Sequence, residues 1–216
     1  MKGDILMISD HHRRAANGVV EIILPEIKQQ KGIYFITVAG ESGAGKSEIA
    51  ESIAKRLKQD GIASYLFQQD DYFHYPPKSN AAMRRKKISH VGTTEVRLDL
   101  LDEEVMMIRS GKLKFVKPLV LFNEDVISEE VIDLSGIKVV IIDGTYTTLL
   151  NNIDCRIFIE RDMNDTRADR LRRNREKQDN YLEKILAIEH QIISSHKNSA
   201  DIIISKDFRV FKNEMP

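Results

Sequence analysis

The sequence contains only one cysteine, Cys155, among its 216 residues. A single cysteine excludes an internal disulfide framework, and no Cys/His spacing suggests a zinc site. The sequence also has neither a signal-peptide segment nor an apolar run of about 18 residues, which predicts a soluble, cytoplasmic protein without a membrane partner. We expect Cys155, beside a predicted strand, to be a small buried hydrophobe and not a nucleophile.

An excess of charge of either sign is also absent, since 33 Lys and Arg residues balance 33 Asp and Glu residues. This balance gives no indication of a nucleic-acid partner, so any electrostatic partner must be met by a local cluster. Hydrophobic residues make up 42% of the chain, enough to bury a core. The length predicts one substantial α/β domain with insertions, and it does not decide between a monomer and a homo-oligomer.

From Ile33 onward, short β-branched apolar runs alternate with helical segments, which predicts a parallel sheet covered by helices on both faces. In such sheets, ligands bind at the carboxyl ends of the strands. We expect strands at 34–38, 63–68, 139–142, 156–160 and 201–205, and helices at 46–59, 94–110, 165–175 and 182–196.

Three segments do not follow this alternation. Residues 1–31 are expected to be an extension packed on the core domain (32–216), with a short helix interrupted at Pro25. The polar stretch 71–93 is too long for an ordinary connection and is expected to be a functional or disordered loop. Residues 112–134 alternate loosely, which predicts a small β-excursion.

The strongest motif is GESGAGKS, in which Gly40, Gly45, Lys46 and Ser47 have the spacing G-x-x-x-x-G-K-[ST] between a predicted strand and a predicted helix. The backbone N–H groups of such a loop and the helix N-terminus bind phosphate, the lysine reaches the β- and γ-phosphates, and the serine ligates Mg²⁺. The motif therefore predicts ATP and Mg²⁺ as cofactors. The expected nucleotide-binding residues are Gly40, Ser42, Gly43, Ala44, Gly45, Lys46, Ser47 and Glu48.

Carboxylates follow two of the predicted strands. Asp143 ends the apolar run VVIID, where an acid can hold Mg²⁺ through water. Asp70 and Asp71 follow YLFQQ, where a carboxylate can accept the proton of an attacking hydroxyl or help to hold Mg²⁺. Strand alternation turns one of this pair toward the nucleotide, and we favour Asp70. The expected metal site is therefore Ser47, Asp70 and Asp143.

Arginines cluster on one predicted helix near the end of the chain, in DTRADRLRRNREK. Arg167 and Arg170 share one side of it, and Arg173 joins them one turn later. We expect these three to close as a lid (about 163–178) over the transferring phosphate, although a solvated charged helix has the same pattern. Arg172 and Arg175 lie on the same helix.

The acceptor molecule is expected to contact residues near Asp70 and in the β-excursion. These candidates are Asp71, Tyr72, His74, Arg84 and Phe122. The other histidines of polar segments, His11, His12 and His90, are expected at the surface.

In their order along the chain, GESGAGKS, QQDDYF, IIDGTY, DTRADRLRRNRE and HKNSADIIIS resemble the uridine kinase and phosphoribulokinase group of P-loop kinases. The resemblance covers about residues 33–205. It implies a five-stranded parallel sheet, ATP with Mg²⁺, and phosphoryl transfer to a hydroxyl of a small metabolite. It also implies that Asp70 is the catalytic base, that Asp143 stands where the group usually has Glu before Gly, and that the arginines belong to the lid.

Two departures concern the acceptor. The Pro-x-Tyr-Asp-Phe run of uridine kinases corresponds here to residues 118–122, PLVLF, without the tyrosine and the aspartate, and SHVGTTEV replaces an expected Asp-His-Pro stretch. A nucleoside is the first expectation for the acceptor, with a sugar phosphate or another small alcohol as alternatives. A nucleotide-dependent switch or ATPase that regulates a partner is the competing hypothesis, in which Gln68 or Gln69 would position water.

Overall fold

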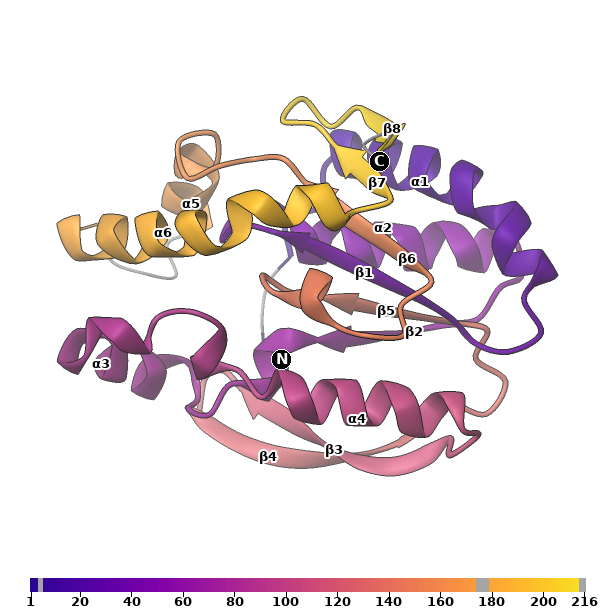
Figure 1. Ribbon diagram of the computed structural model, residues 1–216, viewed down its shortest axis with the longest axis horizontal. Coiled ribbons are helices and arrows are strands. Elements are labelled where there is room, and N and C mark those ends of the chain that lie inside the picture. Colours follow the sequence, from indigo (N-terminus) through magenta and orange to yellow (C-terminus); the bar gives the residue numbers. More distant parts are fainter. Residues whose placement is uncertain (4–5, 174–178, 214–216) are drawn as a thin grey trace.

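A six-stranded sheet forms the centre of the computed structural model, which describes residues 1–3, 6–173 and 179–213 (Figure 1). The strand order is β2–β5–β1–β6–β7–β8, in which the first five strands are parallel and β8 is antiparallel at the edge. The strands are β1 (Tyr34–Gly40), β2 (Ser64–Gln68), β5 (Val139–Asp143), β6 (Cys155–Ile159), β7 (Ile202–Ile204) and β8 (Val210–Lys212). The five parallel strands confirm the predicted fold class, and β8 is one strand more than expected.

The central strands β1 and β5 are buried along their whole length, which explains why their sequences are continuous apolar runs. Their register places Val38 beside Asp143, and β2 places Gln68 beside the same aspartate. The carboxyl ends of three strands therefore meet at one edge, where the phosphate-binding motif follows β1.

Helices cover both faces of the sheet, as predicted (Figure 1). One face is covered by α1 (Asp10–Gln29) and α2 (Lys46–Gln59), which share a core with β1, β5, β6 and β7. The opposite face is covered by α4 (Leu98–Arg109), α6 (Asn180–Ile193) and the hairpin of β3 (Lys114–Leu121) and β4 (Val126–Asp133). Cys155 is buried in the core of the first face, as expected.

The N-terminal helix α1 is longer than expected, and the predicted interruption at Pro25 is wrong. Pro25 lies on the exposed side of the helix, where water can bind the carbonyl that lost its N–H donor. The other side buries residues at helical spacing, including Val19, Ile23 and Ile27. Packing of this apolar side against α2 keeps the helix continuous.

The polar stretch 71–93 is mostly helical, so the expectation of a long loop is wrong, as is its disordered alternative. It contains the second half of the short helix η1 (Gln69–Tyr72), all of α3 (Pro77–Lys86) and η2 (Ile88–His90), and the first residue of the short helix η3 (Thr93–Glu95). Pro77 occupies the first turn of α3, where a proline costs no hydrogen bond. The helix expected at 94–110 begins only at Leu98, as α4.

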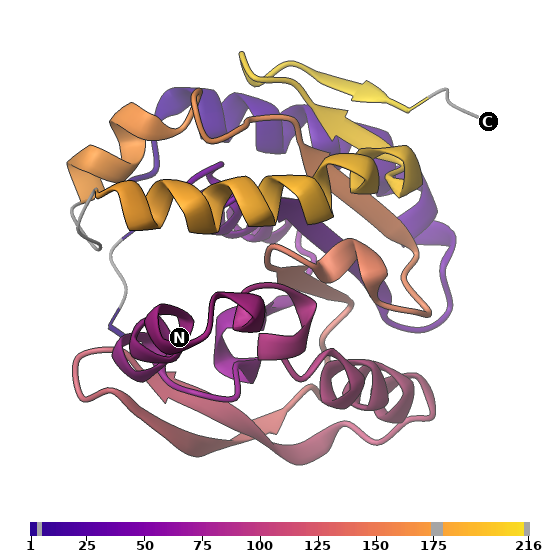
Figure 2. The same ribbon diagram turned by 60° about the vertical axis from the view of Figure 1, so that its left-hand side comes forward.

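The arginine-rich helix α5 (Arg167–Arg173) follows β6, and Asp179 caps the next helix, α6, by accepting from Tyr181 N and Leu182 N. Residues 174–178, which include Arg175 and the end of the expected lid, lie outside the described residues. Figure 2 shows α5 and α6 above α3 and the hairpin. Two short helices, η4 (Thr147–Leu149) and η5 (Ser194–Ser199), complete the fold. Among the described helices, none is long and apolar enough to span a bilayer.

Candidate active site

The phosphate loop, residues 40–47, joins the end of β1 to the start of α2. Gly43 and Gly45 have positive φ values of 85° and 96°, a conformation that glycine adopts without strain. Lys46 Nζ donates to the carbonyl of Glu41 at 2.9 Å, so the ammonium group is held over the loop. The loop and the N-terminus of α2 together offer N–H donors and positive charge to an anion.

Two carboxylates lie next to this loop. Ser47 Oγ donates to Asp143 Oδ2 at 2.5 Å, which joins the start of α2 to the end of β5. Burial raises the pKa of Asp143 to about 7, against the lowering effect of the Ser47 hydrogen bond. Burial at the floor of the site also raises the pKa of Asp70, with Lys46 acting in the opposite direction, while the carboxylate stays accessible from the cavity above it.

A close approach between the ends of β2 and β5 brings these carboxylates together. A Cβ atom on Gly144 would lie 2.2 Å from Gln69 Cβ, so only glycine fits after Asp143. The side-chain carbonyl of Gln69 accepts from Tyr146 N at 2.7 Å and fixes this contact. The Asp-Gly pair therefore has a packing role in addition to ending the strand.

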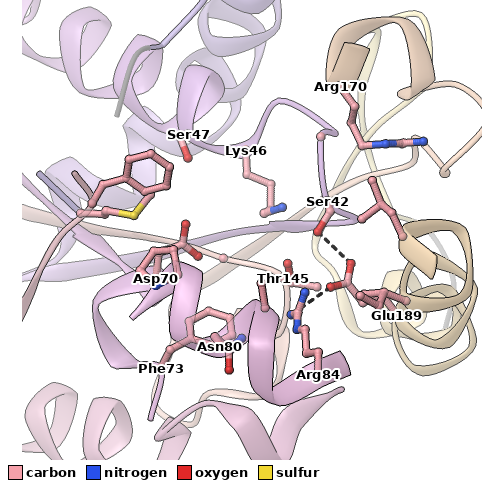
Figure 3. A pocket seen from close by; sticks show the side chains of 18 of the residues that line it. Ser42, Lys46, Ser47, Asp70, Phe73, Asn80, Arg84, Thr145, Arg170 and Glu189 are labelled. Atoms are coloured by element: carbon pink, nitrogen blue, oxygen red, sulfur yellow. Dashed lines mark hydrogen bonds and ion pairs between the residues drawn. The ribbon is translucent and has the colours of Figure 1, made fainter. Parts of the chain in front are cut away.

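A cavity of about 610 Å³ opens over the phosphate loop (Figure 3). Its lining includes Ser42, Lys46 and Ser47 of the phosphate loop, Asp70 and Asp143 after or at the ends of β2 and β5, and Phe73, Asn80, Arg84, Phe122 and Tyr146. The phosphate-binding groups therefore share this cavity with residues of α3 and of the hairpin turn.

A buried polar network crosses this cavity wall. Arg84 donates to both carboxylate oxygens of Glu95, through Nε and Nη2, at 2.7 Å each. Its Nη2 also lies 3.4 Å from Glu189 Oε1, and Ser42 Oγ donates to Glu189 Oε2 at 2.8 Å (Figure 3). Asn80 Nδ2 donates to Glu95 at 2.9 Å. The network connects α3 and α6 with the phosphate loop.

The structure divides the predicted phosphate-site residues into two groups. Ser42, Gly43, Gly45, Lys46, Ser47, Glu48, Asp70, Asp143 and Arg170 line the cavity. Gly40 and Ala44 do not: a Cβ on Gly40 would lie 3.0 Å from Ile159 O, and Ala44 is buried in the core. Arg167 is exposed on α5 and does not line the cavity, and the side chain of Arg173 lies outside the described residues.

The expected acceptor residues divide in the same way, since Arg84 and Phe122 line the cavity and three others do not. Asp71 is buried and accepts from Val120 N, with Lys117 Nζ at 3.1 Å. Tyr72 is buried and donates to Glu104 at 2.5 Å, and His74 is exposed. For Asp71 and Tyr72 the reason is that residues 69–72 form a 3₁₀ turn, whose side chains do not alternate as those of a strand do.

The sequence analysis did not predict two residues of this network, Glu95 and Glu189, which are 0% and 3% exposed. The position of Glu189 in the sequence could have indicated its burial. It follows Ile185 and Leu186 at helical spacing on the apolar face of α6, where an acid is buried only with a partner. Glu95 lies in a short helix without a periodic pattern, so nothing in its local sequence indicated burial.

The oxygen donors beside the phosphate loop suit Mg²⁺, which prefers hydroxyl, carboxylate and phosphate ligands. Ser47, Asp143 and Asp70 would hold the ion together with phosphate oxygens. No group of three or more His, Cys, Asp or Glu side chains forms a metal cage in the part of the chain that the structure describes.

Replacing Asp71 with asparagine should lower stability and leave turnover nearly unchanged. The amide NH₂ group would face the Lys117 ammonium in a buried site, at a cost of about 1–3 kcal/mol in the free energy of unfolding. Urea denaturation and steady-state kinetics of the Asp71→Asn variant measure the two effects. A large loss of kcat at full stability would place Asp71 in the reaction instead.

Arg170 should act on the transferring phosphate, whereas Arg167 should not. Arg170 lines the cavity, and its Cγ lies 2.9 Å from the position of a Cβ on Gly43. Loss of a charged hydrogen bond made in the transition state costs about 1.5–3 kcal/mol, so Arg170→Ala should lower kcat by roughly 10- to 100-fold, with a smaller change in KM for ATP. Arg167→Ala is the matched control on the same helix. Equal kcat and KM values for the two variants would indicate that α5 is only a solvated charged helix.

The fold and the site define a P-loop phosphotransferase: a parallel sheet, a phosphate loop after its first strand, and carboxylates at the adjacent strand ends. The chain belongs to the phosphoribulokinase / uridine kinase family, whose model matches residues 35–209. It is therefore an ATP-dependent small-molecule kinase.

Similar proteins agree with this assignment. The chain is 27% identical over 191 residues to the bifunctional alpha-galactosidase/sucrose kinase AgaSK of Mediterraneibacter gnavus, a match that covers 82% of this chain and only 20% of that much longer protein. It is 26% identical over 183 residues to a uridine kinase of Leuconostoc citreum, covering 78% of this chain and 85% of the relative. The structure of phosphoribulokinase from Rhodobacter spheroides shares the fold, with a TM-score of 0.64 at 12% identity, over 82% of this chain and 71% of that one.

Proposed function

We propose that the protein transfers the γ-phosphoryl group of ATP to a hydroxyl group of a small, uncharged metabolite, a nucleoside or a sugar. One observation carries this proposal: the Asp70 carboxylate shares a cavity with the phosphate loop and with the polar wall formed by Asn80 and Arg84. A base, a phosphate site and an acceptor site are therefore arranged around one space.

Each residue of the phosphate side has a distinct task in this reaction. The loop and Lys46 hold the phosphates, and Asp70 accepts the proton of the attacking hydroxyl. Because the pKa of Asp70 is raised, its carboxylate is a better proton acceptor than that of an ordinary aspartate. The carboxylate is ionised at pH values above this raised pKa. Arg170 covers the loop and excludes water. Bound Mg²⁺, held by Ser47 and Asp143, would neutralise charge on the phosphates.

The charges at the acceptor side support an uncharged acceptor. Arg84 is already balanced by its bidentate pair with Glu95, and Glu189 adds a further carboxyl group. Arg85 pairs with Asp179 and lies over the ring of Tyr181. An anionic acceptor such as a sugar phosphate would find Arg84 and Arg85 already paired with carboxylates, which favours a neutral polyol as the acceptor.

Hydroxyl recognition fits the remaining groups of this wall. Asn80 Nδ2 and Oδ1 are bonded to Glu95 and His90, and each has capacity for one further hydrogen bond; the buried hydroxyl of Tyr146 has no hydrogen-bond partner among the described residues. Phe73 and Phe122 give apolar surface for a base or a sugar ring. The relatives named as uridine kinases favour a nucleoside, whereas the relative named as a sucrose kinase and the changed run 118–122 favour a sugar.

The competing switch hypothesis has less support. It requires a glutamine or glutamate that positions a water molecule. Gln69 is 1% exposed, and its carbonyl is used by Tyr146 N. The large space beside Asp70 also has no purpose in a switch that binds no second metabolite.

A panel of acceptors tests the proposal. ADP release and labelled phosphate transfer would be measured with uridine, cytidine, neutral mono- and disaccharides, sugar phosphates and glycerate. We expect transfer to a neutral member of the panel. Transfer only to an anionic member would contradict the charge argument, and acceptor-independent hydrolysis at the same rate throughout would favour the switch.

A further inference from the structure

The phosphate loop borders open space on a second side as well. A hollow of about 50 Å³ lies there, and Gly43, Gly45 and Glu48 line both this hollow and the large cavity. Its remaining walls come from the N-terminal segment and from the region of α5: Met7, Ser9, His11, His12, Arg161, Asp169 and Arg172. The N-terminal extension therefore reaches the phosphate loop.

His12, in the first turn of α1, makes the closest approach. A Cβ atom on Gly45 would lie 3.0 Å from His12 Nε2, so the imidazole contacts the loop backbone. The side chain is buried, with 7% of the residue exposed, and the ring of Phe208 lies 5.1 Å away, centroid to centroid. The expectation of a surface histidine at this position is therefore wrong.

The hydrogen bonds of His12 determine which ring nitrogen carries the proton. The backbone N–H of Ser9 donates to Nδ1 at 3.1 Å, so Nδ1 is an acceptor. Burial lowers the pKa of His12 to about 4, with the neighbouring His11 adding to the effect, so the ring is neutral at pH 7. A neutral imidazole whose Nδ1 accepts carries its hydrogen on Nε2.

The His12 side chain lines the hollow, and its Nε2 lies next to Gly45, which lines the hollow as well. An N–H group in this position can donate to an oxygen of a ligand that enters the hollow. The reacting end of a nucleotide has to face Asp70 in the large cavity. The rest of the nucleotide then continues along the loop toward Gly45, which His12 contacts.

We propose that His12 is a nucleotide-binding residue, whose Nε2–H donates to an oxygen of the α-phosphate or of the ribose at the side of the phosphate loop opposite Asp70. The inference rests on the proposed kinase function and adds to it, because it makes the N-terminal helix a part of the nucleotide site. The ring of Phe208 beside His12 also contacts the Arg161 guanidinium, whose carbon lies 4.9 Å from the ring centroid.

Calorimetric binding of a non-hydrolysable ATP analogue with Mg²⁺ tests this contact. His12→Asn keeps an acceptor for the Ser9 N–H but has no donor at the Nε2 position, and it should weaken binding by about 3- to 10-fold, the value of one net hydrogen bond. His12→Gln, whose amide nitrogen can replace Nε2, should retain most of the affinity. Arg13→Ala, an exposed change on the same helix, is the matched control. Thermal unfolding of each variant shows whether the helix is intact.

Further nucleotides identify the oxygen. If the ribose accepts, 2′- or 3′-deoxy-ATP should bind the wild type as weakly as ATP binds His12→Asn. If the α-phosphate accepts, inorganic tripolyphosphate should remain sensitive to the substitution. Equal ATP affinity of the wild type, His12→Asn and His12→Gln would overturn the inference and leave the kinase function standing. A wild type that binds no ATP would overturn both.

Discussion

Replacing Asp70 with asparagine should lower kcat by about 10²- to 10⁴-fold and leave ATP binding nearly unchanged. The amide fills the same space at the cavity floor but cannot accept the proton of the attacking hydroxyl. Steady-state kinetics with the acceptor found in the panel, together with calorimetric ATP binding, measure the two effects.

The pH profile gives a second measure of the same role. Asp70 must be ionised to accept a proton, so wild-type activity should fall as the pH falls through its raised pKa. The contribution of Asp70 to this acid limb should be absent from the residual activity of Asp70→Asn, whereas the contribution of Asp143, whose pKa is raised to about 7, should remain. Asp99→Asn, an exposed change on α4, is the matched control and should behave as the wild type. If kcat of Asp70→Asn stayed within about threefold of the wild-type value, Asp70 would not be the base of the reaction.

Lys46→Ala should lower kcat by about 10²- to 10³-fold without unfolding the protein, because it removes charge that stabilises the transferring phosphate. Lys46 lies at the cavity surface, so its loss opens no gap in the hydrophobic core. Activity assays and thermal unfolding of the variant measure the two effects.

Lys55→Ala, on the exposed side of the same helix, is the matched control for charge and helix propensity. Unchanged turnover of Lys46→Ala would contradict the assignment of residues 40–47 as the phosphate site. A variant that failed to fold would contradict the view that Lys46 serves only the ligand.

Local patterns were sufficient for the sheet and for the phosphate side of the site. The apolar runs of β1 and β5 and the spacing of Gly40, Gly45 and Lys46 are contained in short stretches of sequence. They specify both the strand–loop–helix unit and the parallel neighbour that delivers Asp143. These features are predictable because adjacent residues determine them.

The acceptor side was less predictable because distant residues form it. Arg84 and Glu189 are 105 positions apart, and only the packing of α6 beside α3 brings them together. The preference for Asp70 over Asp71 rested on strand alternation, although both lie in a 3₁₀ turn. Asp70 lines the cavity because Asp71 is held by Lys117 and the Val120 backbone. The contact of His12 with Gly45 likewise depends on tertiary packing.

The chain of contacts from Ser42 through Glu189 to Arg84 has a thermodynamic consequence. It joins the phosphate loop to the wall at which we propose that the acceptor binds. A ligand that reorients Arg84 changes the partners of Glu189, and thereby the environment of Ser42. Binding at the two sites is then cooperative, and linkage requires this cooperativity to be reciprocal: the factor by which the acceptor changes ATP affinity equals the factor by which ATP changes acceptor affinity.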